Sequence, residues 1–223
     1  MPKLKIVCLS DTHNQLNQIK IPKGDILIVA GDWTYFGHQN ELQKFGNHLR
    51  KLPHDTKLII PGNHDITLDE KHTLYHKDAI SWIKLDRNTI LGINEIVTIR
   101  NLRILCVSYI NPIGLYNRWG FERDEQAQSD FYNKIKTHDM ILEGPVDIVV
   151  SHSPPFGIMD EENYGSRPLL EFIQQVRPKY HIFGHCHDGH GKQIIDGITY
   201  INSASCTREY KATNKPIVFE IDV

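Results

Sequence analysis

Five short apolar runs, rich in Val and Ile, each end at a side chain that can bind a metal ion. The runs are KIVCLS, DILIVAG, KLIIPG, VDIVVS and HIFG, and they end at Asp11, Asp32, Asn63, His152 and His185. Runs of this length that stop at small or polar residues are typical of buried strands. In an α/β sheet covered on both faces, the loops at the carboxyl ends of the strands build the site. The five endings therefore predict side chains that converge in space.

Composition predicts one soluble domain over residues 1–223. A chain of 223 residues with 40% hydrophobic content can bury one sizeable core. The net charge of −2, from 25 basic and 27 acidic side chains, lacks the positive excess of nucleic-acid-binding proteins, so no stable nucleic-acid complex is expected.

Location and redox state follow from apolar runs and cysteine spacing. The amino-terminal run is too short for a signal-peptide core, and no stretch approaches the roughly 18 apolar residues of a membrane span, so a cytoplasmic protein is expected. Cys8, Cys106, Cys186 and Cys206 form no C-x-x-C pair, which predicts reduced thiols. The sequence leaves the oligomeric state open.

Helical periodicity and alternating patterns predict the remaining elements. Helices are expected over residues 40–52, 125–141 and 168–176, the first from Leu42, Phe45 and Leu49 at helical spacing. Two antiparallel pairs are also expected, one within residues 94–108 turning at Asn101, and one between residues 197–205 and 215–223.

Each motif alone has an ordinary structural explanation, but the set does not. SDTH could cap a helix, GDW and GNHD could be turns, and GHCHDGHG could be a solvated loop. Together the strand ends offer Asp-x-His, Asp, Asn-His-Asp, His and His-x-His, a donor set too large for one tetrahedral zinc ion. Two metals fit this inventory and suit phosphoryl chemistry, and one carboxylate must then bridge the ions.

The motifs D-x-H, G-D, G-N-H-[DE], H and G-H-x-H, complete and in order, resemble those of the calcineurin-like metallophosphoesterases. The segments PKGDILIVAGDWT, SHSPPFGI and VRPKYHIFGHCHDGHG resemble the metallophosphoesterase-domain-containing, class III phosphodiesterase-like subfamily. The resemblance implies an α/β fold: a two-sheet sandwich flanked by helices, with mixed parallel and antiparallel strands.

By motif position, the resemblance also implies the residue roles. The first metal would be held by Asp11, His13 and His187, and the second by Asn63, His152 and His185, with Asp32 as the bridge. His64 would protonate the leaving oxygen or stabilise the transition state, and Asp65 would support that histidine. Some animal members have glycine where His185 stands, so this chain keeps the fuller pattern. Manganese is the expected metal, with iron, zinc, nickel or cobalt as alternatives.

Substrate contacts are expected from the loop YINPIGLYNRWGFERDEQ. Asn117, Trp119 and neighbouring aromatic residues could stack on a nucleobase, and Arg118 could pair with a phosphate oxygen. The alternative places Trp119 and Phe121 in the core. His190, left over from the G-H-x-H motif, could line the substrate pocket or be a solvated loop residue.

The expected function is a two-metal phosphodiesterase for a small phosphodiester, a cyclic nucleotide being the leading candidate. A hydroxide held between the metals would attack phosphorus in line while His64 assists the leaving alkoxide. A phosphomonoesterase or a nuclease could use the same ligands. A metal-binding interaction scaffold is the alternative from another class, although His64 and all ligand positions are retained.

Overall fold

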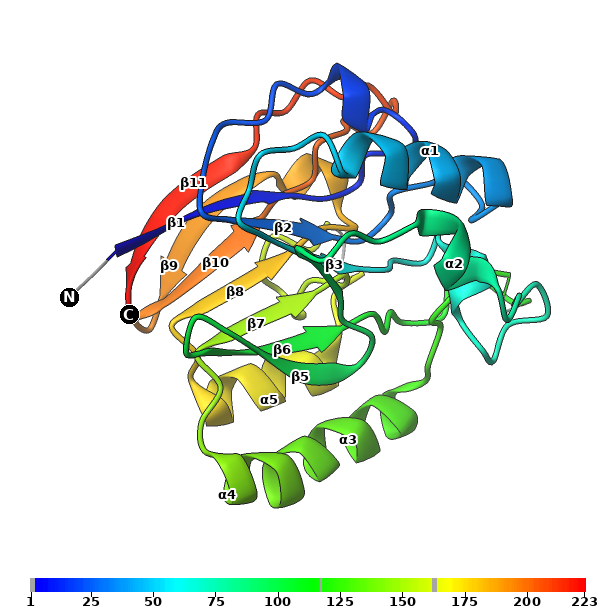
Figure 1. The fold of residues 1–223 in the computed structure, drawn as a ribbon. Helices are drawn as coiled ribbons and strands as arrows, with labels where there is room; N and C mark the ends of the chain where they lie inside the picture. The colour runs from blue at the N-terminus through cyan, green and yellow to red at the C-terminus, as the bar shows by residue number, and fades with distance from the viewer. Residues whose placement is uncertain (1–2, 117, 162–163) are drawn as a thin grey trace.

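Two β-sheets stacked face to face form the centre of the molecule (Figure 1). The computed structural model describes residues 3–223 apart from 117 and 162–163. The first sheet has the order β11-β1-β2-β3-β4, made of Ile217–Asp222, Lys3–Leu9, Ile26–Ala30, Thr56–Ile60 and Thr89–Leu91. The second has the order β5-β6-β7-β8-β10-β9, made of Glu95–Ile99, Leu102–Val107, Ile148–Ser151, Tyr180–Phe183, Ile198–Asn202 and Gly191–Ile195.

Both sheets are parallel at their centres and antiparallel at an edge. Strands β1 to β4 run parallel, with β11 antiparallel beside β1. Strands β6, β7, β8 and β10 run parallel, with β5 and β9 antiparallel at the two edges. This arrangement confirms the expected two-sheet sandwich of mixed strands.

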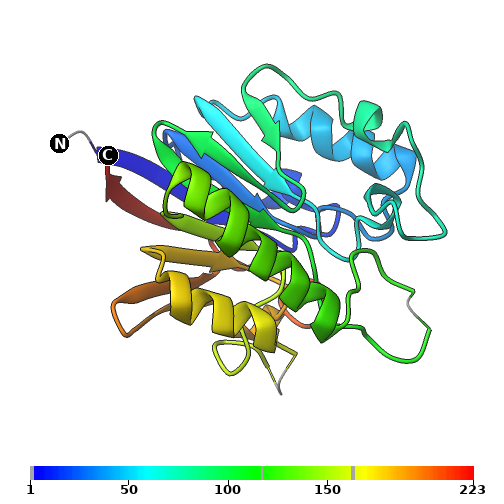
Figure 2. The same ribbon diagram turned by 90° about the horizontal axis from the view of Figure 1, so that it is seen from below.

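Three apolar layers hold the sandwich together. The central layer lies between the sheets and includes Ile28 from the first and Val150 from the second, both fully buried. Helices α1 (Gln39–Leu49) and α2 (Ala79–Ile83) cover the outer face of the first sheet. Helices α3 (Glu125–Lys134) and α5 (Arg167–Val176) cover the outer face of the second, and they cross it side by side in Figure 2. Because both faces of each sheet are covered, the inner strands are mainly apolar, with buried exceptions such as Lys57 and His181.

The helices begin where the sequence provides caps. In α5, the Ser166 hydroxyl accepts a hydrogen bond from the Leu169 amide, and Pro168 occupies the first turn. In α3, the Asp124 carboxylate caps the Ala127 amide. The helix expected over residues 125–141 is interrupted, because α3 passes into a π-helical turn at Ile135–Asp139 before the short α4 (Met140–Glu143).

One expected strand pair is wrong. The pair within residues 94–108 is present as β5 and β6, but β10 and β11 are not neighbours. Strand β10 forms a hairpin with β9, while β11 crosses to the other sheet and pairs with β1, with Ile6 opposite Phe219. The apolar pattern identifies a strand but not its partner, because Phe219 and Ile221 complete the core from either sheet.

The two sheets meet at the carboxyl ends of their parallel strands. An isolated bridge joins Ser10, just after β1, to Ala204, just after β10, and the Ser10 amide donates to the Ser203 carbonyl at 2.9 Å. The loops after β1, β2, β3, β7 and β8 all open at this junction. The predicted ligands of both sheets therefore face one another.

A buried histidine outside this junction makes the fold sensitive to acid. His181, fully buried on β8, contacts the Ser151 hydroxyl through Nε2 at 2.7 Å, and Nδ1 has no partner among the described residues. Burial lowers the pKa of His181 to about 3. Below pH 6.5, the ordinary pKa of histidine, His181 is protonated in the unfolded chain but stays neutral in the folded chain. The free energy of unfolding that is present above pH 6.5 is therefore lost as the pH falls towards 3.

We expect His181→Gln to flatten this pH dependence. The slope of unfolding free energy against pH between 6.5 and 4 should fall by up to about 1.4 kcal/mol per pH unit, the effect of one proton. Urea denaturation at several pH values measures it, with the exposed His138→Gln as the matched control. An unchanged slope in His181→Gln would assign the acid sensitivity to other groups.

No described helix has the length and apolar character needed to cross a bilayer.

Candidate metal centre

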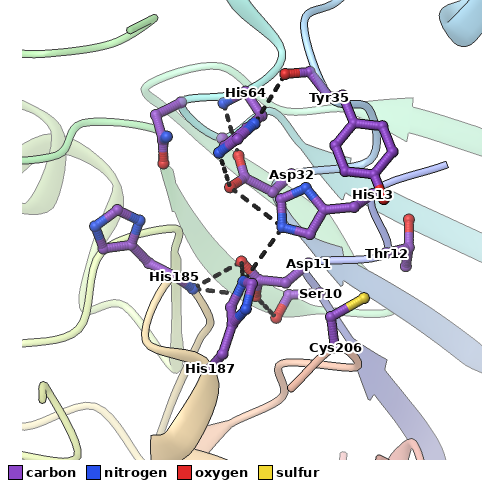
Figure 3. A network of polar contacts seen from close by, with 12 residues as sticks. Ser10, Asp11, Thr12, His13, Asp32, Tyr35, His64, His185, His187 and Cys206 are labelled. Carbon is purple, nitrogen blue, oxygen red and sulfur yellow. Dashed lines mark hydrogen bonds and ion pairs between the residues drawn. The ribbon is translucent and has the colours of Figure 1, made fainter. Parts of the chain in front are cut away.

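Imidazole and carboxylate groups from both sheets form adjoining clusters at the junction (Figure 3). Asp11, His13 and His187 place one potential ligand atom each within 4.8 Å of one another. Asp32, His152 and His185 form a second such group, and His13, Asp32 and His64 a third. The first group contains the three side chains predicted for the first metal, and the second contains His152 and His185 of the second predicted set together with the predicted bridge Asp32. Loops separated by more than 150 positions in the chain are thereby brought together.

The carboxylate of Asp32 faces both clusters. Its Oδ1 lies 3.2 Å from His152 Nε2, and its Oδ2 lies 4.0 Å from His13 Nε2. Asp32 is 2% exposed, so neither oxygen is taken up by solvent. One oxygen directed to each cluster is a geometry in which a carboxylate can bridge two ions.

The second cluster also includes the predicted amide ligand. The Asn63 side-chain oxygen lies 2.9 Å from His152 Nε2, and the rings of His152 and His185 are 5.1 Å apart. In the first cluster, the Nε2 atoms of His13 and His187 face each other at 3.2 Å. Several lone-pair donors directed at shared points, without thiolate, suit borderline or hard divalent ions.

Backbone carbonyls fix the orientation of three rings. Nδ1 of His13 contacts the Thr34 carbonyl at 3.3 Å, Nδ1 of His152 the Ala30 carbonyl at 2.9 Å, and Nδ1 of His187 the Thr207 carbonyl at 2.9 Å. A carbonyl can only accept, so Nδ1 carries the hydrogen in each ring and Nε2 is directed to the cluster. This arrangement, which orients histidines around metal ions, shows that the residues present fit a metal pair.

The backbone of four predicted metal ligands adopts a conformation that residues other than glycine rarely adopt. Asp11, His13, Asp32 and His185 have φ angles of 50°, 38°, 53° and 67°. Non-glycine residues in this left-handed region cost about 1–2 kcal/mol each. Four of the seven predicted ligands therefore lie in strained turns, as expected where the surroundings hold side chains in place for function.

Glycines before three ligands leave the space that the clusters occupy. A β-carbon on Gly184 would lie 2.2 Å from both Asp11 Oδ2 and the Ser10 hydroxyl, and one on Gly62 would lie 2.3 Å from Asp32 Oδ1. The recurring G-D, G-N-H and G-H-x-H motifs thus have a steric cause, because any larger residue would collide with a ligand from another loop.

We expect Gly184→Ala to damage the first cluster without large unfolding. The added methyl must displace the Asp11 carboxylate, which should lower metal affinity by about tenfold or more and stability by about 1–3 kcal/mol, as overpacking does. Metal titration and denaturation measure the two effects. Gly157→Ala, where no atom lies within 4 Å but the φ of +76° adds backbone strain, is the control for metal affinity: it should lower stability and leave affinity unchanged. Unchanged affinity in Gly184→Ala would show that Asp11 can move without loss.

The comparisons with known proteins agree with this geometry. A family model described as calcineurin-like phosphoesterase matches residues 4–189. The chain belongs to this family. Metallophosphoesterase domain-containing protein 1 of Homo sapiens is 34% identical over 97% of this chain and 71% of its own length. A Caenorhabditis elegans protein of the UPF0046 group is 34% identical over 99% of this chain and 76% of its own length.

Solved structures share the fold of this calcineurin-like phosphoesterase. The crystal structure of TT1561 of Thermus thermophilus superimposes with a TM-score of 0.65 at 13% identity and covers 90% of this chain and 89% of that chain. At this identity the similarity extends to the architecture alone.

Neighbouring charged groups in the phosphoesterase centre shift one another's pKa values. Burial lowers the pKa of His152, but the Asp32 carboxylate outweighs burial and raises it to about 9. Burial is likewise outweighed at His187, where Asp11 raises the pKa to about 9. Burial raises the pKa of Asp32, yet His152 and His64 hold it well below its ordinary value. Protons and metal ions compete for the same imidazole nitrogens, so metal affinity falls as pH falls.

His64 lies at the edge of both clusters, with its ring in a defined orientation. Its Nδ1 donates to the Tyr35 carbonyl at 2.8 Å, and its Nε2 lies 4.0 Å from Asp32 Oδ2. The backbone amide of His64 also donates to Asp32 Oδ1 at 2.8 Å. Nε2 is therefore the nitrogen that can exchange a proton with a bound molecule.

In the part of the chain that the structure describes, backbone amides and the Thr34 hydroxyl, not the His64 ring, hold the Asp65 carboxylate. The Asp65 carboxylate accepts hydrogen bonds from the amides of Thr34 and Gly62, at 3.1 and 2.9 Å, and from the Thr34 hydroxyl at 2.8 Å. These donors occupy the carboxylate, and the Tyr35 carbonyl holds the ring instead. Burial and the charge of Asp32 raise the pKa of Asp65 to about 7. Asp65 thus acts on His64 through the backbone of the loop that follows β2.

A cavity of about 260 Å³ opens over the clusters. Its described lining includes Asp32, Asn63, His64, Trp119, His185 and His187. Of the predicted substrate residues, Trp119 is here, with its ring 4.3 Å from that of His64. Arg118 lines a neighbouring cavity, while His190 lies outside this lining and contacts the Ala204 backbone. Asn117 lies outside the described residues.

Four further lining residues have no signal in the motifs: Ile113, Glu161, Arg208 and Tyr210. The Tyr210 ring lies 4.7 Å from that of His13 and 5.2 Å from that of His187. It is brought there by the loop after the SASCT segment, which the Gln15 amide ties down through the Tyr210 carbonyl at 2.8 Å. Phe121, by contrast, is buried, as the alternative for the aromatic loop expected.

Proposed function

We propose that this protein is a two-metal phosphodiesterase that hydrolyses a small phosphodiester, a cyclic nucleotide being the leading candidate. The observation that supports it most is the position of Asp32, with one oxygen directed to each of two imidazole-rich clusters. Two divalent ions bound there would activate water and stabilise negative charge on the phosphoryl oxygens. Manganese is the proposed metal, with iron, zinc, nickel and cobalt as alternatives.

His64 supplies the proton transfer in this proposal. One P–O bond forms to the oxygen of the attacking water, and the P–O bond to the leaving alcohol breaks. The leaving oxygen takes a proton from Nε2 of His64, while Nδ1 stays hydrogen-bonded to the Tyr35 carbonyl. The attacking water gives up a proton to solvent, and His64 regains a proton at Nε2 from solvent, which restores the starting state.

Among the described lining residues, Arg208 carries the one permanent positive charge, against the carboxylates of Asp32 and Glu161. Two divalent ions would add four positive charges, so the ions rather than the lining would balance the charge of the phosphate ester. The cavity of about 260 Å³ suits a small substrate.

The test compares matched phosphate esters on metal-defined protein. Metal-stripped protein is reloaded with manganese, and separately with the alternative metals, and assayed with bis(p-nitrophenyl) phosphate and p-nitrophenyl phosphate. Diester preference that is lost in His64→Ala supports the proposal. Monoester preference would indicate a phosphatase, and bound metal without hydrolysis of either ester would favour a binding role.

The partner proposed is the small phosphodiester alone, without a stable nucleic-acid complex or membrane attachment. The proposed location is the cytoplasm. Both proposals rest on the near-neutral charge and the four separated cysteines.

A further inference from the structure

The carboxylate of Glu41, in the first turn of α1, is buried beneath the loop that follows β2. It accepts hydrogen bonds from the amides of Tyr35, Phe36 and His38, at 3.1, 3.2 and 2.9 Å, and from the Asn14 side chain. A glutamate at this helix position needs only the His38 amide to cap the helix. The other three donors belong to the loops after β1 and β2, which carry predicted groups of the metal centre.

Two of these amides share a peptide group with a carbonyl that holds a histidine ring. The N–H of Tyr35 donates to Oε1 of Glu41, and the carbonyl of the same peptide group accepts from Nδ1 of His13 at 3.3 Å. The N–H of Phe36 donates to Oε2, and the carbonyl of that peptide group, which belongs to Tyr35, accepts from Nδ1 of His64 at 2.8 Å (Figure 3). Each carboxylate oxygen is therefore connected to one ring through a single peptide group.

We infer that Glu41 is a positioning residue that orients His13 and His64 together through these two peptide groups. For His64 the inference rests on the proposed function, and for His13 on its predicted place among the metal ligands. A peptide group is planar, so holding its N–H also fixes the direction of its carbonyl. A negative charge at the N–H end strengthens the carbonyl as an acceptor, because hydrogen bonds in a chain polarise one another.

The same carboxylate holds the backbone that carries His13. Asn14, the next residue, donates from its side chain to Oε1 of Glu41. Both His13 and Asn14 have left-handed backbone conformations, with φ angles of 38° and 64°. Such conformations persist only where the surroundings enforce them. Glu41 therefore fixes His13 at two points, its ring and the residue that follows it.

The negative charge of Glu41 is maintained although the side chain is only 9% exposed. Burial raises the pKa of Glu41, but the hydrogen bonds from Asn14 and the three backbone amides hold it below its ordinary value. In Glu41→Gln the side chain keeps its size, but one oxygen becomes an NH2 group that can only donate. That group would face backbone N–H donors, so at least one of the two peptide groups would lose its anchor.

Metal titration of proteins with a single site tests the contribution to His13. His185→Ala leaves the predicted first site, and His187→Ala leaves the predicted second site. Adding Glu41→Gln to His185→Ala should weaken manganese binding by about 10- to 100-fold, the usual effect of removing a group that orients a ligand. Adding it to His187→Ala should leave manganese affinity unchanged, because neither peptide group contacts a ligand of the second site.

Nitrogen-15 NMR of the metal-free protein tests both rings without metal or turnover. In alkaline buffer, where imidazole is mainly neutral, the ring nitrogens report which of them carries the hydrogen. Glu41→Gln should change His13 and His64 from one Nδ1–H form to a mixture of both tautomers. The spectrum contains its own control in His48, on the same helix, whose Nδ1 contacts the Lys44 carbonyl at 2.8 Å and should not change.

Asp124→Asn, which neutralises the carboxylate that caps α3, is the matched variant and should alter neither affinity nor tautomers. Glutamine also serves in a capping box, so α1 should stay folded in Glu41→Gln, and circular dichroism checks this. An equal loss of affinity at both sites, or a change in only one of the two rings, would overturn the inference. Altered tautomers in both rings, with no phosphate ester hydrolysed by the wild type, would support the role of Glu41 and reject the proposed function.

Discussion

Asp32→Asn should reduce the metal content from two ions per chain to at most one. The amide keeps the shape of the carboxylate but offers one oxygen acceptor and no charge, whereas Asp32 directs one oxygen to each cluster. Loss of a metal pair removes several kcal/mol of transition-state stabilisation, so turnover should fall by at least about a thousandfold.

Metal analysis of dialysed protein and steady-state kinetics together check the Asp32 prediction. Asp130→Asn, an exposed carboxylate on α3, is the matched control and should keep both ions and full turnover. The side-chain oxygen of the substituted amide can still accept the His64 backbone N–H, so the loop should remain folded, and circular dichroism tests this directly. Two ions retained in Asp32→Asn would show that another group bridges them.

His64→Ala should reduce turnover by about 10²- to 10⁴-fold, the usual contribution of a general acid, while metal content stays the same. The ring is not needed to position Asp32, because the backbone amide of residue 64 makes that hydrogen bond. The loss should be larger for an alkyl leaving group than for p-nitrophenolate, which departs without protonation.

The dependence on leaving group separates chemistry from structure for His64. His48→Ala, which changes a histidine on α1 far from the clusters, controls for removal of an imidazole elsewhere. An equal loss for alkyl and nitrophenyl esters would assign His64 to charge stabilisation rather than proton donation. Loss of metal along with activity would place it among the ligands.

The sequence predicted the candidate metal ligands best, because few residue types can bind a metal ion. The strand ends bring Asp11, Asp32 and His152 to one place because parallel strands share an edge, and ligand chemistry restricts which residues can stand there. The steric need for glycine at Gly62 and Gly184 makes the motifs recognisable. Two sheets with mixed strands were therefore predictable from the motifs and the family resemblance.

Other features depend on contacts that no local pattern encodes. Strand β11 pairs with β1 at the edge of the first sheet, whereas its apolar residues indicate only that it is a strand facing the core between the sheets. Asp65 is held by backbone amides that become neighbours only after folding, so its motif position did not reveal these partners. Tyr210 approaches the centre through a long loop whose path follows no periodicity.

The centre joins the two sheets, since Asp11, Asp32 and Asn63 come from the first and His152, His185 and His187 from the second. Ions bound there would act as cross-links between halves of the sandwich that otherwise meet mainly through apolar contacts. A ligand at 100 times its dissociation constant adds about 2.7 kcal/mol to stability. Scarcity of metal would then do more than stop catalysis: it would leave the sheets freer to separate, and proteases would remove the chain sooner.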